Sequence, residues 1–423
     1  MGTDNRKKIA FLTLGCKLNY AETSTYERGF RQAGLEVVPW SVPADAYLIN
    51  TCSVTATSDA KSRNLVRKVL RVNPSAIVVV TGCSAQLRRE DYEAIPGVSL
   101  VFGCSQKASV VPETLALLDG RSQPAMTSCE SAVFGAWSSG ERTRSFLKVQ
   151  DGCNNYCAYC TVPYARGESR NIPISECVEN ARQIAALGVK EIVLTGVNTG
   201  DFGRTTGESF LDLLKALNGV EGIERYRISS IEPNLLTHEI VDWTASGTKF
   251  QPHFHIPLQT GSDVLLQKMG RHYGTADFAA LIDYVRHAFE GPGKPLVFFG
   301  IDVMVGLPGE TPELFRQTYS FLEQRVRPSF IHVFPYSRRP GTPAASMPGQ
   351  VSEAVKKERV AALEELSSRL HSEFIEANRG VRERALLEST EHSGYMEGYT
   401  GNYIRIRRPW DPSLCGKIID VTI

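Results

Sequence analysis

The hydrophobic positions of this chain form short apolar runs that alternate with amphipathic stretches. In the first part of the chain, the apolar runs that read as buried strands are 9–14, 46–50, 77–81 and 99–102. The stretches with helical spacing between them are 21–32, 58–70 and 85–94. This alternation predicts parallel βαβ units, an open sheet covered by helices on both faces, over residues 1–120.

A second alternating series follows residues 121–142, a Ser-, Gly- and Ala-rich segment without a period that we interpret as a linker. The predicted strands of this series are 145–150, 191–195, 226–229, 253–256, 297–305 and 330–334. The helical patterns include 175–186, 209–217 and 278–289. Six such units predict a partial (βα)6 barrel over residues 143–371, with its functional residues at the carboxyl ends of the strands.

The last part of the chain changes character. A Pro- and Gly-rich loop at 339–349 precedes a long amphipathic helix at 352–377. After it, residues 403–407 alternate between apolar and basic side chains, and glycines interrupt the pattern. Short alternating segments of this kind predict a small β-barrel over residues 372–423.

Composition is consistent with ordinary globular domains. Hydrophobic residues make up 42% and charged residues 22% of the 423 residues, enough for two or three buried cores. No apolar stretch approaches the roughly 18 residues of a membrane-spanning helix. Lys7 and Lys8 before the apolar run 9–14 resemble an export signal, but this run is shorter than the roughly 7–15 residues such a signal needs. We therefore expect a cytoplasmic protein without a membrane partner.

The net charge of +1 neither supports nor excludes a nucleic-acid partner. The ten cysteines are more informative, because clustered cysteines in a reducing compartment are usually metal ligands or catalytic groups rather than disulfides. Their spacing therefore decides the interpretation.

The strongest motif is Cys153-x3-Cys157-x2-Cys160, within the segment Asp151-Gly-Cys-Asn-Asn-Tyr-Cys-Ala-Tyr-Cys160. Three thiolates in a tight loop can bind three corners of a 4Fe–4S cube and leave one iron open, whereas electron-transfer clusters close all four corners. Zinc sites lack this spacing. The motif resembles the signature of the radical S-adenosylmethionine superfamily, including the aromatic Tyr159 before the last cysteine. The resemblance implies that the open iron binds S-adenosylmethionine.

Three further cysteines, Cys16, Cys52 and Cys83, each follow the end of a predicted strand in the first domain. Loops after adjacent parallel strands meet at one edge of the sheet, so these thiols are expected to converge there. Isolated cysteines are more often small core residues. Their equivalent positions in successive strand–loop units favour a second 4Fe–4S cluster. The cysteines without such a placement, which we interpret as core or surface thiols, are Cys104, Cys129, Cys177 and Cys415.

Together these features resemble the methylthiotransferase family over essentially the whole chain, most closely in residues 143–170. The resemblance implies a flavodoxin-like first domain with an auxiliary 4Fe–4S cluster, a radical S-adenosylmethionine barrel and a C-terminal TRAM-type β-barrel that binds RNA. It also implies two S-adenosylmethionine molecules, one as methyl donor and one as radical source. A flavodoxin or ferredoxin would supply the electrons.

The residues beside the first-domain cysteines separate three branches of that family. The isopentenyladenosine branch tends to have Cys-Gln-Met-Asn at the first cysteine, and the branch that modifies a ribosomal-protein aspartate tends to have Cys-Pro-Lys-Asn. Here the segment is Cys16-Lys17-Leu18-Asn19, which resembles the threonylcarbamoyladenosine branch. The implied substrate is N6-threonylcarbamoyladenosine at position 37, in the anticodon stem-loop of tRNA, methylthiolated at carbon 2.

The resemblance also implies S-adenosylmethionine contacts at the strand ends of the barrel. The implied residues, beside Tyr159, are Gly196 and Asn198, then Ser229, Ser230 and Glu232, then Gln259, and finally Asp302 and Val305. Ordinary loop and capping roles compete with each assignment. His253 and His255 share one face of a strand, where a core role is the more common alternative.

Basic residues offer candidate contacts to substrate. Arg166 is a candidate for substrate or the cofactor carboxylate, with a surface ion pair as the alternative. Arg405 and Arg407 share a strand face near Tyr403, which suits phosphate contact and stacking. Five basic residues of the predicted helix after Cys52 are further phosphate candidates, although solvated basic faces are common. A non-catalytic iron–sulfur RNA-binding protein and a zinc module remain alternatives from other classes.

Overall fold

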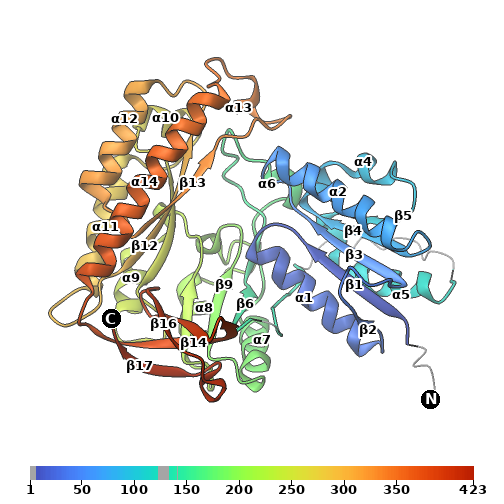
Figure 1. Cartoon of the computed structure of the whole chain (residues 1–423). Coiled ribbons are helices and arrows are strands. Elements are labelled where there is room, and N and C mark those ends of the chain that lie inside the picture. Colours follow the sequence, from blue (N-terminus) through green and yellow to red (C-terminus); the bar gives the residue numbers. More distant parts are fainter. Residues whose placement is uncertain (1–5, 122–132, 141) are drawn as a thin grey trace.

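The computed structural model describes residues 6–121, 133–140 and 142–423, so most of the predicted linker and Cys129 lie outside the described residues. Figure 1 shows three parts: a blue α/β unit that contains the N-terminus, a green-to-orange barrel, and a red sheet beneath the barrel. No helix of the described residues is long and apolar enough to cross a membrane.

The first unit is a parallel five-stranded sheet with the order β2-β1-β3-β4-β5, the flavodoxin-like order. Its strands are β1 (Lys8–Thr13), β2 (Glu36–Val37), β3 (Ala46–Thr51), β4 (Ile77–Gly82) and β5 (Val98–Phe102). Its helices are α1 (Lys17–Gln32), α2 (Ala56–Val72), α3 (Cys83–Leu87), α4 (Arg89–Glu93) and α5 (Val110–Leu118), with the 3-10 turn η1 (Cys104–Ser109) before α5.

Strand alternation places successive side chains in two separate cores. Tyr47 and Ile49 of β3 pack with α2, α3 and α4 on one face. Ala46 and Leu48 pack with α1 and α5 on the other face. The predicted helix at 85–94 is divided into α3 and α4, because the backbone leaves helical geometry at Arg88 (φ −135°, ψ 38°). The unit is therefore the doubly covered open sheet that the sequence predicts.

The barrel consists of two three-stranded parallel sheets with the orders β10-β9-β6 and β11-β12-β13. Their strands are β6 (Arg144–Lys148), β9 (Glu191–Thr195), β10 (Arg225–Ile228), β11 (His253–Gln259), β12 (Phe298–Val305) and β13 (Phe330–Pro335). Parallel bridges from Tyr226 to Phe250 and from Ser230 to His255 join the two sheets. The result is a partial barrel that is open between β6 and β13.

Helices cover the outside of the barrel and bury a large apolar core against it. They are α7 (Ile174–Ala186), α8 (Phe210–Asn218), α9 (His238–Ala245), α10 (Asp263–Lys268), α11 (Thr275–Phe289), α12 (Pro312–Ser320), the π-helical turn η4 (Phe321–Val326) and α14 (Glu353–Ala377). Shorter elements at the barrel rim are β7 (Gln150–Asp151), α6 (Val162–Arg166), β8 (Arg170–Asn171), η2 (Thr199–Asp201), η3 (Pro233–Leu235) and α13 (Pro343–Ser346). α14 extends through Ala377, so residue 372, the predicted start of the last domain, lies within a helix.

The first unit contacts both edges of the open barrel. On the β6 side, residues 133–139 bridge the two, because Lys148 donates its backbone N–H to Ala136 O and Trp137 pairs with Leu147. On the β13 side, Arg339 donates to Ser53 Oγ at 2.8 Å and pairs with Asp59 at 2.5 Å. These contacts hold the first unit across the opening of the barrel.

The C-terminal strands form a curled antiparallel sheet, a half-barrel, with the order β16-β15-β14-β17 (Figure 1). They are β14 (Arg382–His392), β15 (Tyr395–Thr400), β16 (Arg405–Pro409) and β17 (Ile418–Thr422), with the turn η5 (Pro412–Leu414) before β17. Arg227 of β10 anchors the sheet by donating to Gly401 O at 2.7 Å and Thr400 O at 2.8 Å. Glu191 neutralises this buried guanidinium at 2.7 Å.

The turn at the end of β4 requires glycine. Gly82 has φ +102°, and a Cβ there would lie 2.4 Å from Thr51 O. We expect Gly82→Ala to lower the free energy of unfolding of the first unit by about 3 kcal/mol, from backbone strain and overlap. Gly34→Ala is the matched control, because Gly34 has φ +88° but open space around it, and we expect a loss of about 1 kcal/mol. Urea unfolding followed by circular dichroism measures both; equal losses would contradict the overlap argument.

Candidate active site

Cys153, Cys157 and Cys160 lie in the loop between β7 and α6, where they are buried or half-buried. The backbone N–H of Asn155 donates to Cys153 Sγ at 3.5 Å, and that of Val162 donates to Cys160 Sγ at 3.4 Å. Amide donors of this kind stabilise thiolates that bind iron. The loop therefore holds the three sulfurs close enough that, beyond the effect of burial, charges on Cys157 and Cys153 raise the pKa of Cys160.

Arg271 completes the surroundings of this loop, and the sequence did not single it out. Its Nη1 donates to Cys157 Sγ at 3.2 Å and to Tyr159 Oη at 3.4 Å. Its Nη2 forms an ion pair with Glu232, one of the predicted cofactor contacts. Arg271 follows α10 and carries no local motif, so only the folded chain reveals it.

The thiol pKa values show what this loop lacks by itself. Burial, with a smaller contribution from the charge of Cys157, raises the pKa of Cys153 to about 11 and that of Cys160 to about 12. These thiols are therefore protonated at neutral pH unless a cation compensates their charge. Bound iron supplies that charge and releases the protons, so the loop fits a metal cluster.

The second trio also converges. Cys16, Cys52 and Cys83 follow β1, β3 and β4, which are neighbours in the sheet. A Cβ on Gly15 would lie 3.0 Å from Cys52 Sγ, so the Cys16 loop passes directly against Cys52. Burial, with smaller contributions from the charges of Cys83 and Cys16, raises the pKa of Cys52 to about 11, as expected for adjacent sulfurs. All nine described cysteines are free thiols.

The two trios are in contact with each other. Thr161, next to Cys160, donates its hydroxyl to the backbone oxygen of Ser53, next to Cys52, at 3.4 Å. Arg166 at the end of α6 donates Nε–H to Cys83 Sγ at 3.2 Å. The sequence predicts convergence within each trio, and the structure adds the contact between them.

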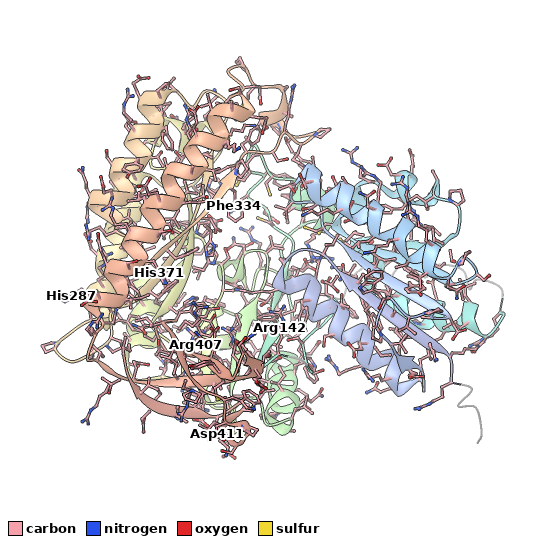
Figure 2. All side chains as sticks on the ribbon, in the orientation of Figure 1. Arg142, His287, Phe334, His371, Arg407 and Asp411 are labelled. Carbon is pink, nitrogen blue, oxygen red and sulfur yellow. The ribbon has the colours of Figure 1, made fainter. Side chains whose placement is uncertain are left out.

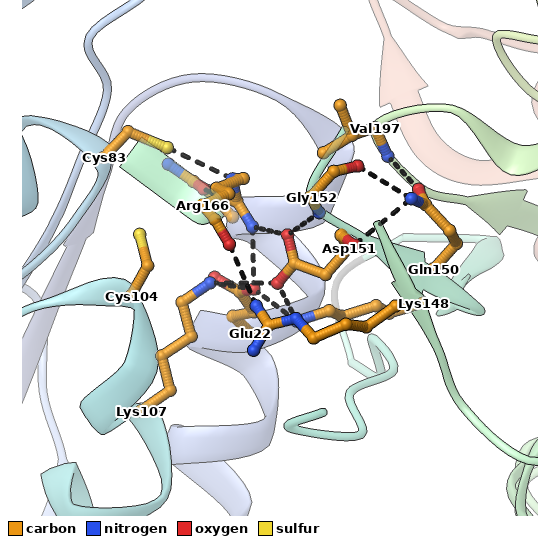
Figure 3. A network of polar contacts seen from close by, with 12 residues as sticks. Glu22, Cys83, Cys104, Lys107, Lys148, Gln150, Asp151, Gly152, Arg166 and Val197 are labelled. Carbon is orange, nitrogen blue, oxygen red and sulfur yellow. Dashed lines mark hydrogen bonds and ion pairs between the residues drawn. The ribbon is translucent and has the colours of Figure 1, made fainter. Parts of the chain in front are cut away.

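Beneath Cys83 lies a buried charge network formed by Glu22, Lys107, Lys148, Asp151 and Arg166, each at most 4% exposed (Figure 3). Glu22 Oε1 accepts from Lys107 at 2.6 Å, from Lys148 at 2.9 Å and from Arg166 at 3.3 Å. Asp151 accepts from Lys148 at 2.7 Å and from Arg166 at 2.8 Å. Three cations thus face two carboxylates.

The excess positive charge lies next to Cys83. Burial alone would raise the pKa of Glu22, but the surrounding cations lower it to about 2. A hydrogen bond with Cys104 and the charges of Arg166 and Lys107 lower the pKa of Cys83 against the effect of burial. The network therefore stabilises negative charge on this sulfur, as an iron-bound thiolate requires.

The structure also shows where Arg166 and the cysteines outside the two trios lie. Arg166 is 4% exposed and donates to Cys83, Asp151 and Asn19, so the structure places it in the network rather than at the substrate cavity. Cys104 is a buried neighbour of Cys83, Cys177 is fully buried in α7, and Cys415 is half-buried.

The loop after β9 is organised by Gln150. Its Oε1 accepts from the N–H groups of Val197 and Asn198 at 3.0 and 2.9 Å, and its Nε2 donates to Gly152 O at 2.7 Å (Figure 3). This joins the loop of Gly196 and Asn198 to the first cysteine loop. Asn198 Oδ1 is buried without a hydrogen-bond partner among the described residues. That free acceptor suits an ammonium group, such as that of S-adenosylmethionine.

Other predicted cofactor contacts lie near the strand ends. Gln259 ends β11 with φ +70°, a conformation that non-glycine residues adopt mainly at constrained sites. Val305 ends β12 and is fully buried. Ser230 bridges to His255 between the two half-sheets, and Ser229 faces the cavity described next.

A cavity of about 740 Å³ lies between the first unit, the barrel interior and the C-terminal sheet. The first unit contributes Thr13, Gly15, Cys16, Lys17 and Tyr20. The barrel side contributes Arg142, Arg144, Phe146, Val193, Arg227, Ile228, Ser229, His253, His255, Phe298, Gly300, Phe330 and His332. The last part contributes His371, Tyr399, Tyr403 and Arg405. Figure 2 labels Arg142 near α1 and His371 on α14, on opposite sides of it. The two histidines of β11 thus face a cavity rather than a filled core.

His255, Asp302 and His332 form a polar cluster at this wall. His255 Nε2 and Asp302 Oδ1 are 2.7 Å apart, and the His255 and His332 rings stack at 4.9 Å. Their ligand-type atoms lie within 4.8 Å of one another, so the cluster has metal-compatible spacing. The hydrogen bond satisfies His255 and Asp302 without a metal.

Arg405 and Arg407 lie on β16. Arg405 lines the cavity and is 3.5 Å from Glu397. Arg407 lies over the exposed ring of Tyr395 at 4.0 Å (labelled in Figure 2). An exposed arginine–tyrosine pair offers both a charge and a stacking surface.

Comparison with known proteins gives the class and then the family. Residues 8–103 match the family described as "Uncharacterized protein family UPF0004", and residues 147–322 match the radical SAM superfamily. The solved structure of TsrM from Kitasatospora setae, a radical S-adenosylmethionine methyltransferase with cobalamin and a [4Fe-4S] cluster, has the same fold, with a TM-score of 0.59 and 15% identity over 80% of this chain and 77% of that chain. The fold and the cysteine loop therefore define a radical S-adenosylmethionine enzyme, a class whose cofactors are 4Fe–4S clusters and S-adenosylmethionine.

The curated relatives are more specific. The chain is 39% identical to the threonylcarbamoyladenosine tRNA methylthiotransferase MtaB of Bacillus subtilis (strain 168), over 98% of this chain and 93% of that protein. The protein of that name from Aquifex aeolicus (strain VF5) is 37% identical over 98% and 100%. The tRNA-2-methylthio-N(6)-dimethylallyladenosine synthase of Pelotomaculum thermopropionicum is 32% identical over 99% and 95%. The chain belongs to the tRNA methylthiotransferase family.

The charge network yields a stability prediction. Glu22→Gln leaves three buried cations facing Asp151 alone, so we expect a loss of about 3 kcal/mol in the free energy of unfolding of the cluster-free chain. The control Glu27→Gln changes an exposed i,i+4 pair on the same helix and should cost about 0.5 kcal/mol or less.

The difference in the free energy of unfolding between wild type and Glu22→Gln also depends on pH. Because the folded pKa of Glu22 is lowered to about 2, its contribution is complete above its ordinary value of 4.5 and is lost as pH falls towards 2. The difference between wild type and Glu22→Gln in urea unfolding should therefore shrink across that range. A difference that stays constant down to pH 2.5 would rule out the charge argument.

Proposed function

We propose that this chain converts N6-threonylcarbamoyladenosine at position 37 of tRNA to its 2-methylthio derivative and consumes two S-adenosylmethionine molecules, one as methyl donor and one as radical source. The observation that carries the proposal is the contact between the two cysteine trios, one of which also lines a basic, aromatic cavity through Cys16. A single cluster would serve radical formation alone; a second trio next to it suits sulfur insertion.

In this proposal Cys153, Cys157 and Cys160 hold the cluster that binds S-adenosylmethionine, and Cys16, Cys52 and Cys83 hold the auxiliary cluster. When bound, the first cluster would supply the electron that releases a primary carbon radical from S-adenosylmethionine, which can abstract hydrogen from an aromatic C–H bond that no side-chain base can deprotonate. The second cluster would supply a site for the sulfur. A flavodoxin or ferredoxin is the proposed electron donor.

The chain's own residues hold and orient these groups. Asn198, with its free Oδ1, is assigned to the methionine ammonium, together with Gly196. Arg271 holds Glu232 and the sulfur of Cys157 at once, which fixes the cofactor site relative to the cysteine loop. The other proposed contacts to S-adenosylmethionine are Tyr159, Ser229, Ser230, Gln259, Asp302 and Val305.

The remaining surfaces are assigned to RNA. We place the modified base in the cavity, where Tyr399 and Tyr403 stack at 4.8 Å. Arg405 at the cavity and Arg407 beside Tyr395 are assigned to phosphates of the anticodon stem-loop. The negative charge of the RNA backbone favours contact with both arginines. This gives residues 1–120 the auxiliary cluster, 143–371 the radical chemistry and the C-terminal strands the RNA contact.

The choice among branches rests on two supports. Three relatives named for threonylcarbamoyladenosine are 39%, 37% and 35% identical to the chain, whereas those named for dimethylallyladenosine are 32% and 31% identical; further relatives named for threonylcarbamoyladenosine are 30–32% identical. The cavity lining is also basic, which suits a substituent with a carboxylate better than a hydrocarbon.

Deletion of the gene tests the substrate. Mass spectrometry of tRNA nucleosides should show loss of 2-methylthio-N6-threonylcarbamoyladenosine and accumulation of its precursor, both reversed by the wild-type gene and not by a Cys157→Ala gene. If the 2-methylthio derivative of isopentenyladenosine disappears instead, the other tRNA branch is the correct one. If neither changes, the assignment to tRNA is wrong.

Cysteine variants test the two cluster assignments separately. Anaerobically reconstituted wild type should bind about eight irons per chain, and Cys157→Ala and Cys83→Ala about four each. Only Cys157→Ala should also lose reductive formation of 5′-deoxyadenosine, because Cys83 serves the other cluster. The control Cys177→Ala removes a buried thiol of α7 and should keep the full iron content. Retention of full iron content in Cys83→Ala would remove the auxiliary site.

A further inference from the structure

The cavity has an unbalanced electrostatic lining. Among the described residues that line it, there are five cations and no carboxylate. The cations are Lys17, Arg142, Arg144, Arg227 and Arg405. The neighbouring carboxylate of Asp302 is hydrogen-bonded to His255. An anion is therefore the ligand that this cavity is best suited to bind.

Three of the cations have carboxylate partners. Arg227 pairs with Glu191 at 2.7 Å, Arg144 pairs with Glu388 at 3.2 Å, and Arg405 lies 3.5 Å from Glu397. Arg227 also donates to two backbone carbonyls of the C-terminal sheet. Arg227 and Arg144 thus join the barrel to the C-terminal sheet, whereas the charge of the exposed Arg405 is only partly offset by Glu397.

Arg142 and Lys17 have no carboxylate partner within the part of the chain that the structure describes. Arg142 lies over the rings of Tyr20 and Phe146, at 4.5 and 5.6 Å from their centroids. Lys17 makes no ion pair or hydrogen bond with any residue that the structure describes. It is therefore the cation of the lining whose ammonium group is most available to a ligand.

The surroundings of Lys17 favour an incoming anion. Its side chain is exposed and lines the cavity. Lys17 is also the first residue of α1, whose first turn has no acidic residue and whose N-cap, Cys16, makes no side-chain cap. The positive end of the helix dipole therefore adds to the positive charge of the lining.

We propose that Lys17 binds the threonine carboxylate of the substrate and thereby selects threonylcarbamoyladenosine over adenosines with an uncharged N6 substituent. This inference rests on the proposed function. The carboxylate of the threonine substituent would form an ion pair with the ammonium group of Lys17, next to Cys16. An N6 substituent made of hydrocarbon would cover the same ammonium group and leave its charge buried without a partner. Selection thus has an attractive and a repulsive component.

Lys17 is adjacent to a cluster ligand but contributes no ligand itself, so it can differ without loss of the cysteine trio. This makes it a specificity-determining residue rather than a catalytic one.

The test measures binding, independent of turnover. Two fluorescent anticodon stem-loops are compared at fixed salt with the full, cluster-loaded chain: one carries N6-threonylcarbamoyladenosine, and the other carries the methyl ester of its threonine carboxylate. Wild type should bind the acid about 10- to 100-fold more tightly than the ester, the range of one charge-assisted contact. The ester removes the negative charge and leaves the size and hydrogen bonds of the substituent nearly unchanged.

Variants assign that preference to one side chain. Lys17→Gln should bind the ester as wild type does and the acid no more tightly, while Lys17→Arg should retain most of the preference. The matched control Lys215→Gln removes an exposed lysine of α8 on the outside of the barrel and should behave as wild type. Iron content and circular dichroism report whether each variant is intact.

Several results would overturn the inference: equal affinity of wild type for acid and ester, a preference that persists in Lys17→Gln, or an equal weakening of both ligands, which indicates a phosphate contact or a structural role. If Lys17→Gln fails to fold, equal affinity of wild type for acid and ester still overturns the inference, and Lys17→Arg still tests the side chain. The proposed function fails separately, when the acid stem-loop gives no methylthiolated product. A charge preference without product leaves the anion site standing, and product without preference removes only the role of Lys17.

Discussion

The position of Arg166 between the two cysteine loops is the constraint on which the rest of the structure depends. Its guanidinium contacts Cys83 in the first unit and Asp151 in the barrel, and it reaches Asn19, which in turn donates to the backbone at Leu14 and Thr51. One side chain thereby fixes the ends of β1 and β3, the first residue of α3 and the start of the other cysteine loop. Displacement of this group would move both sets of thiols together.

Burial of five charged groups is costly unless they neutralise one another, and here the balance is one positive charge in excess. This excess positive charge lies next to the sulfur of Cys83 and stabilises negative charge on it. A thiolate at Cys83 completes the balance, so the network is best satisfied when the auxiliary site carries negative charge. Electrostatics thus connects docking of the first unit on the barrel with the readiness of its cysteines to bind iron.

The sequence predicts the strands well because each is a short apolar run closed by glycine or a polar residue. It also predicts the cysteine trios, since local spacing defines the first and the repeated strand-end position defines the second. It does not predict β2, because two residues carry no periodicity, nor the division of residues 85–94 into two helices, because the break at Arg88 is conformational. The strand predicted at 253–256 is longer in the structure, because β11 continues to Gln259 through a bulge after Pro257.

The roles of long polar side chains are the part that sequence cannot supply. Arg166 and Arg271 each act between segments distant in the chain, and nothing in their neighbours distinguishes a buried guanidinium from a solvated one. The same holds for Cys104, which lies beside Cys83 only because η1 returns to the end of β4. Tertiary contact decides whether such residues position sulfur or substrate.

The separation between buried and cavity-lining charges explains how one scaffold can serve several substrates. Each member of the buried network contacts several others, so a change in one disturbs the rest. Among the described residues, Lys17 forms no hydrogen bond or ion pair, and Arg142 contacts the rings of Tyr20 and Phe146; both side chains face the cavity. Residues with few internal contacts can change at little cost to stability, and a cavity wall is where such a change alters selectivity. In the proposed function, substrate selection therefore falls to residues that contribute little to the stability of the fold.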